Sequence, residues 1–167
     1  PSRALPYILH CSAKVDTTGQ SVKLMFSNTG TAAAVFHVYD RRDLKAIPRR
    51  YMVEPDKQLD DVWITATGQY DLWILGPNGF HRSFRGDLSS KNQVESLPEI
   101  RVCMDECSKL YLKVRNDADK AVTLRVKANA YLGKEKVWEI KTAKQEQELY
   151  WDMDEFGGWY DFTVTLA

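Results

Sequence analysis

Residues 67–86, which read TGQYDLWILGPNGFHRSFRG, decide the fold. Apolar and polar side chains alternate from Tyr70 to Ile74, which is the period-two pattern of a half-buried β-strand. The sequence GPNG at 76–79 predicts a tight turn, because glycine and asparagine tolerate positive φ and proline fixes a corner. Residues 80–84 are then expected to return as the second arm of a β-hairpin.

The strand pattern occurs twice in the chain. Two pairs of segments match: GQYDLWI at 68–74 with GWYDFTV at 158–164, and LPYILHC at 5–11 with LPEIRVC at 97–103. We expect residues 5–11 to form the first strand. Between them, Leu24 falls on Leu112 and Phe36 falls on Leu124 without a gap. Chance rarely aligns both turns and apolar positions, so we expect two copies of one fold.

The spacing of the strands predicts the fold class. The first copy contains about seven short strand patterns with turn signals every eight to twelve residues, which is typical of a β-sandwich. We therefore predict an all-β protein of two tandem immunoglobulin-like, Greek-key β-sandwich domains with about six to seven strands each. The first domain is expected at 1–91 and the second at 92–167, with polar residues 89–93 as the linker and with the last strand of the second domain absent. Tyr70 and Tyr160, each behind a glycine-containing turn, resemble the tyrosine corner of such sandwiches.

The second copy also settles how one strand of the first is oriented. Residues 33–39 are apolar enough to face either way, but their counterparts carry polar residues at alternate positions. Phe36 and Val38 should therefore point inward, and His37 and Tyr39 outward. Residues 134–147 fit a strand as well as a helix. Four tryptophans are expected in the core or at its edge: Trp63, Trp138, Trp151 and Trp159.

Composition excludes several classes of protein. The 167 residues include 23 Lys+Arg and 23 Asp+Glu, interleaved, with a net charge of zero, which argues against a dedicated nucleic-acid binder. The charges divide mildly, with a small positive excess in 1–92 and an equal negative excess in 93–167. No apolar run is long enough to span a bilayer, and no signal peptide is visible. Because the chain starts at Pro1, we expect it to be a piece of a longer protein.

The sequence contains no recognisable catalytic constellation. His10, His37 and His81 lack metal-ligand spacing, and no Gly-x-Ser-x-Gly elbow is present. We therefore predict no catalytic residue, no cofactor and no metal site. Two acidic clusters, DD at 60–61 and DMDE at 152–155, could form a weak calcium site, but solvent-exposed acids at strand ends are the favoured interpretation.

Three cysteines are too few for a disulfide scaffold. Cys103 and Cys107 could close a tight hairpin in an oxidising compartment. Three free thiols, with Cys11 as the third, fit the sequence equally well.

The densest basic stretch covers the connection expected at 40–48 and the start of the fourth strand, which is expected at 49–54. It consists of Arg41, Arg42, Lys45, Arg49 and Arg50. With Tyr39 beside it, this stretch could attract anionic phosphate groups at a lipid surface, although a solvated loop is the favoured alternative. Trp73, on the outward side of its strand, could stack on a sugar or hold a quaternary ammonium group. An interface between domains is the favoured role for it.

Four stretches are specific enough to indicate a family: LPYILH at 5–10, SNTGTAAAVFHVYD at 27–40, PRRYMVEP at 48–55 and YDLWILGPNGFHRSFRG at 70–86. They resemble the C-terminal region of secreted bacterial phospholipases C of the phosphocholine-preferring type. In that family a large catalytic domain of the alkaline-phosphatase-like superfamily precedes two related β domains. The resemblance runs from about Leu5 to Leu166 and is weakest at 143–155. It carries over no catalytic residue, because the family's nucleophile and metal ligands lie upstream.

The resemblance implies a non-catalytic accessory unit of a secreted phospholipase C that acts on phosphatidylcholine or sphingomyelin. It implies as partners the catalytic domain of the same polypeptide and a phospholipid membrane surface, and an extracellular location. We expect the excised chain to be a monomer. The alternative is a stand-alone carbohydrate-binding or adhesion module, which would need a flat row of exposed aromatic side chains.

Overall fold

The structure is a computed structural model that describes residues 5–16, 18, 20–89, 98–105, 107, 109–117, 119–133 and 137–167. The chain divides into two compact units, Pro1–Gln93 and Val94–Ala167. Both are built from antiparallel β-strands, as the sequence predicts, and the only helical elements in the described residues are two short 3-10 turns. The expected linker at 89–93 lies, except for Ser89, outside the described residues.

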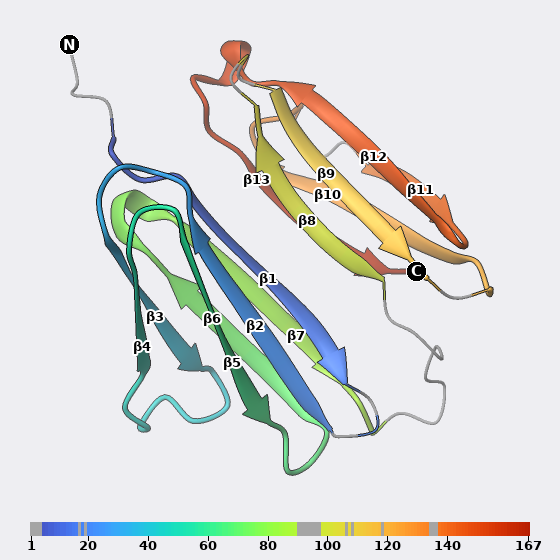
Figure 1. The fold of residues 1–167 in the computed structure, drawn as a ribbon. Coiled ribbons are helices and arrows are strands. Elements are labelled where there is room, and N and C mark those ends of the chain that lie inside the picture. The colour runs from blue at the N-terminus through green and yellow to red at the C-terminus, as the bar shows by residue number, and fades with distance from the viewer. Residues whose placement is uncertain are drawn as a thin grey trace. The chain divides into compact units, whose positions relative to one another are not determined.

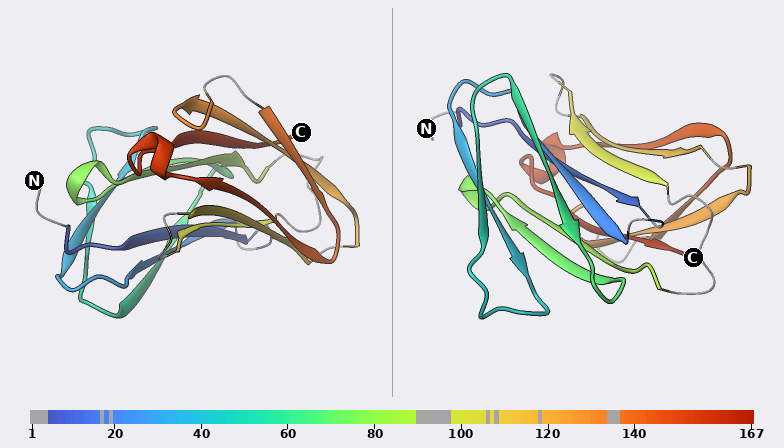
Figure 2. Two further views of the ribbon diagram at one scale, coloured as in Figure 1. Left: turned by 90° about the horizontal axis from the view of Figure 1, so that it is seen from above. Right: turned by 60° about the horizontal axis from the view of Figure 1, so that its bottom comes forward.

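The first unit contains seven described strands in two sheets (Figure 1). They are β1 (Leu9–Asp16), β2 (Ser21–Asn28), β3 (Ala34–Asp40), β4 (Arg49–Val53), β5 (Lys57–Ile64), β6 (Gln69–Leu75) and β7 (His81–Asp87), with the turn η1 (Pro77–Gly79) before β7. One sheet has the order β1-β2-β5 and the other β4-β3-β6-β7. Figure 2 shows the β6–β7 hairpin, in green, in the layer other than that of β1 and β2. The two layers enclose one core.

The second unit contains six described strands in two sheets. They are β8 (Glu99–Met104), β9 (Lys109–Asn116), β10 (Val122–Ala130), β11 (Val137–Thr142), β12 (Gln145–Asp152) and β13 (Asp161–Leu166), with the turn η2 (Asp154–Phe156) before β13. The sheets have the orders β12-β9-β8 and β11-β10-β13. Residues 137–142 and 145–152 are thus strands, so the strand interpretation of this stretch is correct.

Pairing registers recur between the units. Leu24 lies opposite Asp61 and Leu112 opposite Leu149. Likewise, Val38 faces Ile74 in one sheet, and the residues at their repeat positions, Val126 and Val164, face each other in the other unit. The alternation of the sequence sets which face is buried, as predicted: Phe36 and Val38 are fully buried, whereas His37 and Tyr39 between and beside them are only partly covered.

A buried asparagine ties the two sheets together in each unit. The amide nitrogen of Asn28, at the end of β2, donates hydrogen bonds to the backbone oxygens of Ala32 (2.8 Å) and Val53 (3.2 Å). Asn116, at the end of β9, does the same to Lys120 (3.0 Å) and Thr142 (2.9 Å). Both asparagines are completely buried. Each therefore satisfies one buried and one partly buried carbonyl group.

Two local expectations are wrong. The first strand was expected over 5–11 but runs over Leu9–Asp16, because the oxygen of Pro6 instead accepts hydrogen bonds from the turn after β2, at Thr31 N (2.8 Å) and Ala32 N (3.4 Å). Trp159, expected at the core, is 59% exposed. Trp159 follows Gly157 and Gly158, which both have positive φ, and precedes β13. Its neighbour Tyr160 packs against the core of the second unit instead.

Candidate functional site

The outward side of the four-stranded sheet carries the aromatic residues that the sequence singles out. Tyr39 on β3 lies opposite Trp73 on β6, and their ring centroids are 5.9 Å apart. The Arg41 guanidinium stands over the Trp73 ring, 4.7 Å from its centroid. The backbone of Arg41 is held beside β6, since the Arg41 N–H donates to the oxygen of Asp71 at 2.9 Å.

Further basic residues lie on the same side of this sheet. Arg50 on β4 pairs with His37, and Arg85 on β7 pairs with Asp71. Arg85 was not a candidate in the sequence, although its alternation with Phe84 and Gly86 is a signal that could have placed it here. We call the set Tyr39, Arg41, Arg50, Trp73 and Arg85 the outer face. It combines three cations with two aromatic rings on one sheet.

One acidic group is buried within this surface. The Oδ1 atom of Asp71 is inaccessible to water and accepts no hydrogen bond from the described residues. Asp71 lies between Gln69 and Trp73 on the outward side of β6, and the backbone before and after it belongs to the sheet. A carboxylate oxygen without a donor is costly, and it lowers the positive potential of the outer face.

The structure divides the basic stretch that the sequence presents as continuous. Arg49 and Arg50 are consecutive on β4 and therefore point to opposite sides of the sheet. Only Arg41 and Arg50 join the outer face. Arg42 donates from Nη1 to the oxygen of Gln69 (2.7 Å), and Lys45 lies in the exposed loop before β4.

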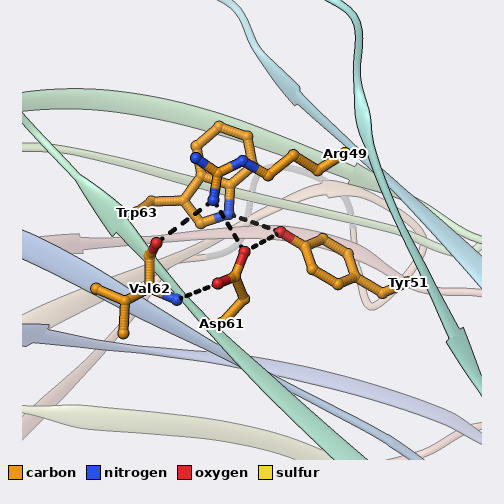
Figure 3. Close-up of polar contacts among 5 residues, drawn as sticks. All are labelled: Arg49, Tyr51, Asp61, Val62 and Trp63. Carbon is orange, nitrogen blue, oxygen red and sulfur yellow. Dashed lines mark hydrogen bonds and ion pairs between the residues drawn. The ribbon is translucent and has the colours of Figure 1, made fainter.

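Arg49 instead belongs to a polar cluster that we call the clasp, formed by Arg49, Tyr51, Asp61 and Trp63 (Figure 3). The Tyr51 hydroxyl donates to Asp61 Oδ2 (2.6 Å), and Arg49 Nη1 donates to the same oxygen (2.9 Å). Trp63 Nε1 donates to the Tyr51 hydroxyl (3.2 Å), and the Arg49 guanidinium stacks on the Trp63 ring at 4.0 Å. Because β4 and β5 belong to different sheets, the clasp closes the sandwich at one edge.

The clasp shifts the acidities of its members. Burial raises the pKa of Tyr51, and the hydrogen bond to Asp61 adds to this effect, bringing it to about 12. Burial alone would raise the pKa of Asp61, but the hydrogen bonds from Tyr51 and Arg49 outweigh it and lower that pKa below its usual value. The cluster is therefore held as a neutral phenol and an ionised carboxylate at neutral pH. Because it joins β4 to β5 across the two sheets, the clasp serves the fold.

The two tyrosines assigned a structural role are partly buried at the start of β6 and before β13. Burial raises the pKa of Tyr70, whose hydroxyl lies against Gly86 so closely that a Cβ there would be 2.6 Å from it. Tyr160 stacks on Phe162 with ring centroids 5.9 Å apart. Tyr70 packs against the core of the first unit, but its hydroxyl makes no hydrogen bond to the described residues. The tyrosine corner therefore stays a prediction.

The cysteines and the described acidic residues form no further site. Cys11, Cys103 and Cys107 are free thiols, and burial raises the pKa of Cys11 to about 12. Among the described residues, no group of three or more His, Cys, Asp or Glu side chains is placed to hold a metal ion. Asp60 pairs with Lys23 at 2.8 Å, as expected of a strand-surface acid. No helix in the part of the chain that the structure describes is long and apolar enough to cross a membrane.

Fold and surface together define a tandem β-sandwich module whose first unit carries a basic, aromatic face. The family model described as "Bacterial phospholipase C, C-terminal domain" matches residues 1–87 and 98–167. The chain belongs to this family.

Three curated relatives match almost the whole chain. The non-hemolytic phospholipase C of Pseudomonas aeruginosa is 37% identical over 99% of the chain, and that of Burkholderia pseudomallei is 36% identical over 98%. The hemolytic phospholipase C of P. aeruginosa is 29% identical over 100%. The chain spans only 24%, 24% and 26% of their respective lengths.

Among solved structures, the secreted serine protease VesC from Vibrio cholerae aligns over 92% of this chain and 42% of its own. At 11% identity and a TM-score of 0.22, that likeness carries no argument.

Proposed function

We propose that the chain is a non-catalytic accessory module of a secreted phospholipase C that acts on phosphatidylcholine or sphingomyelin. Its role is to support the catalytic domain of the same polypeptide at the lipid surface, with the outer face as the contact. Membership of the family supports the first part of the proposal. The observation that carries the second is the arrangement of Arg41, Arg50 and Arg85 around Tyr39 and Trp73 on one exposed sheet.

The outer face suits the boundary between lipid and water. Tryptophan and tyrosine combine an apolar ring with a polar edge, and arginine binds phosphate oxygens through several N–H donors. The second unit has Lys127 and Thr163 at the positions of Tyr39 and Trp73, and its Arg125 is paired with Glu139. The proposed contact therefore belongs to the first unit alone.

The carbohydrate-binding alternative gains no support from this surface. A sugar would need the open face of Trp73, but Arg41 stands over that ring. Because the Arg41 guanidinium already occupies the π-face of Trp73, that face is also not available to bind a quaternary ammonium group. Phosphate groups, in contrast, would meet the guanidinium directly.

Vesicle sedimentation tests the proposed contact. Each basic residue near an anionic leaflet contributes about 1 kcal/mol, so Arg41→Glu with Arg50→Glu should weaken binding to phosphatidylserine-containing vesicles by more than about tenfold at low salt. High salt should reduce the difference, because screening shortens the reach of the charges. Trp73→Thr, which installs the residue of the second unit, should weaken binding with little dependence on salt.

The matched control is Lys14→Glu, because Lys14 is exposed on β1 in the other sheet of the same unit. It should leave sedimentation nearly unchanged. If wild-type chain stays in the supernatant at low salt, or if Lys14→Glu weakens binding as much as the double variant, the outer face is not a lipid contact.

Catalytic silence is tested separately with p-nitrophenylphosphorylcholine and phosphatidylcholine vesicles, with and without zinc or calcium. We expect no turnover above buffer. Metal-dependent turnover that persists through repurification would show that the chain is itself an enzyme.

A further inference from the structure

The connection between β3 and β4 carries two aliphatic side chains that lie in solvent. Leu44 is 67% exposed and Ile47 is 85% exposed, and we call these two residues the tip pair. The core of the first unit, as far as the structure describes it, is formed by other side chains. In the described part of the connection between β10 and β11, by contrast, Leu132 is buried in a core. The core of the first unit therefore does not need the tip pair, and its exposure to water is unfavourable.

The connection has a defined shape, because two successive turns form it. The Asp43 N–H donates to the oxygen of Asp40 (3.1 Å), and the Ala46 N–H donates to that of Asp43 (3.2 Å). The side chains of the two acids support these turns. Asp40 Oδ1 accepts from the Arg42 N–H at 2.9 Å, and Asp43 Oδ1 accepts from the Lys45 N–H at 3.2 Å. Little ordering of the chain is thus needed when the tip pair meets a partner.

Basic residues surround the tip pair. Residues 41–50 contain five arginines or lysines and one acid, Asp43. Arg42 is anchored to the sandwich, since its Nη1 donates to the oxygen of Gln69 at 2.7 Å, and Lys45 is exposed between the two aliphatic residues. Cations beside exposed aliphatic groups match the layers of a phospholipid leaflet, in which anionic phosphates lie outside the hydrocarbon.

The size of this surface favours lipid over protein as its partner. A stable protein interface buries about 800 Å² of each partner, which is far more than two aliphatic side chains supply. A membrane, in contrast, binds small apolar groups together with flanking cations. Residues 41–47 are exposed throughout, and Figure 1 shows this connection, in cyan, projecting at the end of the first unit where β3 ends.

We propose that the connection between β3 and β4 penetrates a phospholipid leaflet. The tip pair lies in the outer part of the hydrocarbon, and Arg42 and Lys45 lie at the phosphates. Asp43 limits the depth, because a carboxylate is costly to move into hydrocarbon. The inference rests on the proposed lipid contact, since Arg41 and Arg50 of the outer face flank this connection. It adds to that contact an apolar part that salt does not screen.

Sedimentation with vesicles of phosphatidylcholine and phosphatidylserine tests the insertion in the variant Leu44→Ser with Ile47→Ser. The favourable transfer of both side chains out of water is lost, so binding should weaken by at least about tenfold, and by a similar factor at low and at high salt. Leu44→Ile with Ile47→Leu keeps the apolar area and should bind like wild type. Because the tip pair is exposed, urea unfolding should be unchanged in both variants.

The matched control is Ile8→Ser. Ile8 is 52% exposed and precedes β1, at the opposite end of the first unit from the connection between β3 and β4 (Figure 1). This change removes an aliphatic side chain of the same kind and should leave sedimentation unchanged. An equal loss of binding in Ile8→Ser would show that the effect is not specific to the tip pair and would overturn the inference.

Depth is measured by NMR in bicelles of the same lipids, in which a phospholipid carries a nitroxide near the start of its acyl chain. The nitroxide should broaden the amide signals of Leu44 and Ile47 more strongly than those of Tyr39 and Trp73. If the bound chain shows no more broadening at the tip pair than at Ile8, the connection faces away from the bilayer and the inference is wrong. A protein surface would then be the partner to seek.

The insertion and the outer-face contact can fail separately. If the tip-pair variant keeps its binding while Arg41→Glu with Arg50→Glu loses it, the outer face is the contact and the insertion is overturned. If the tip-pair variant loses binding while Arg41→Glu with Arg50→Glu binds like wild type, the insertion holds and the outer face is not the contact. Wild-type chain that stays in the supernatant at both salt concentrations overturns both.

Discussion

Replacing the clasp by the residues of the second unit should leave the first unit nearly as stable as before. Pairing registers place Trp138, Ile140, Leu149 and Trp151 at the positions of Arg49, Tyr51, Asp61 and Trp63. All four are apolar, and the Trp138 and Trp151 rings meet edge to face with centroids 5.2 Å apart. The perturbation is therefore the triple variant Arg49→Trp, Tyr51→Ile and Asp61→Leu.

The single variant Asp61→Leu should be far more harmful than the triple one. It removes the carboxylate that accepts the Tyr51 hydroxyl hydrogen bond, and Tyr51 is only 9% exposed. A buried hydroxyl that loses a charged acceptor lowers the free energy of unfolding by about 1.5–3 kcal/mol. Loss of the Arg49 ion pair adds little, since the Arg49 side chain is 48% exposed. The triple variant removes the buried phenol together with its acceptor. Of the clasp, only the Trp63 Nε1–H then loses its acceptor, and Trp63 is partly exposed, so we expect the stability of the triple variant to lie within about 1 kcal/mol of wild type.

Urea unfolding followed by the amide NMR signals of each unit measures these changes, with the midpoint of the second unit as an internal reference. Asp60→Leu is the matched control. Asp60 precedes Asp61, but its pair with Lys23 is exposed, so its removal should cost less than about 1 kcal/mol. A triple variant that loses as much stability as its single variants combined would refute the view that the clasp and the apolar quartet are equivalent ways to close the edge.

Three further outcomes follow from buried polar groups. The first unit should lose stability as pH rises from about 10 toward 12. The reason is that Tyr51 has a pKa of about 12 in the folded chain but near 10 in the unfolded chain. In a profile of urea midpoint against pH, Tyr51→Phe should remove this alkaline loss of stability. Asn28→Ala should lower the urea stability of the first unit by about 1–3 kcal/mol, and Asn116→Ala that of the second, since each removes the donor of one buried and one partly buried carbonyl. Cys11 should react with a thiol-specific disulfide reagent at pH 8 at least about a hundredfold more slowly than exposed Cys107, because its raised pKa suppresses the thiolate, and equal rates would contradict its burial.

The sequence could predict what depends on local alternation and turns. The inward direction of Phe36 and Val38 follows from the alternation of apolar and polar residues in the matching strand of the second copy, and positive φ at Asn78 and Gly79 follows from GPNG. Comparison of the two copies also predicts how the strands are aligned with one another, because a shift of one residue would bury the polar side of a strand.

The sequence could not predict which strands share a sheet. Arg49 and Asp61 are separated by a turn and lie in different sheets, and only the packing of the two layers brings them together. The division of the basic stretch, in contrast, could have been predicted from the sequence, because Arg49 and Arg50 begin an expected strand. Consecutive residues on a strand point to opposite faces, so Arg49 and Arg50 cannot serve one surface unless the strand is twisted or bulged between them.

The two units differ most at positions where side chains bond only to other side chains and not to the backbone. The carbonyls that Asn28 and Asn116 bind are backbone groups, and no substitution can remove them, so both units keep an asparagine at this place. The clasp consists of side chains that can be replaced together, and the second unit has an apolar quartet instead. The outer face has no such structural demand, because neither Tyr39 nor Trp73 fills the core and the second unit folds with lysine and threonine there. The sandwich therefore does not require an aromatic pair under an arginine on that surface, and for this reason we propose that the outer face makes a contact outside the unit.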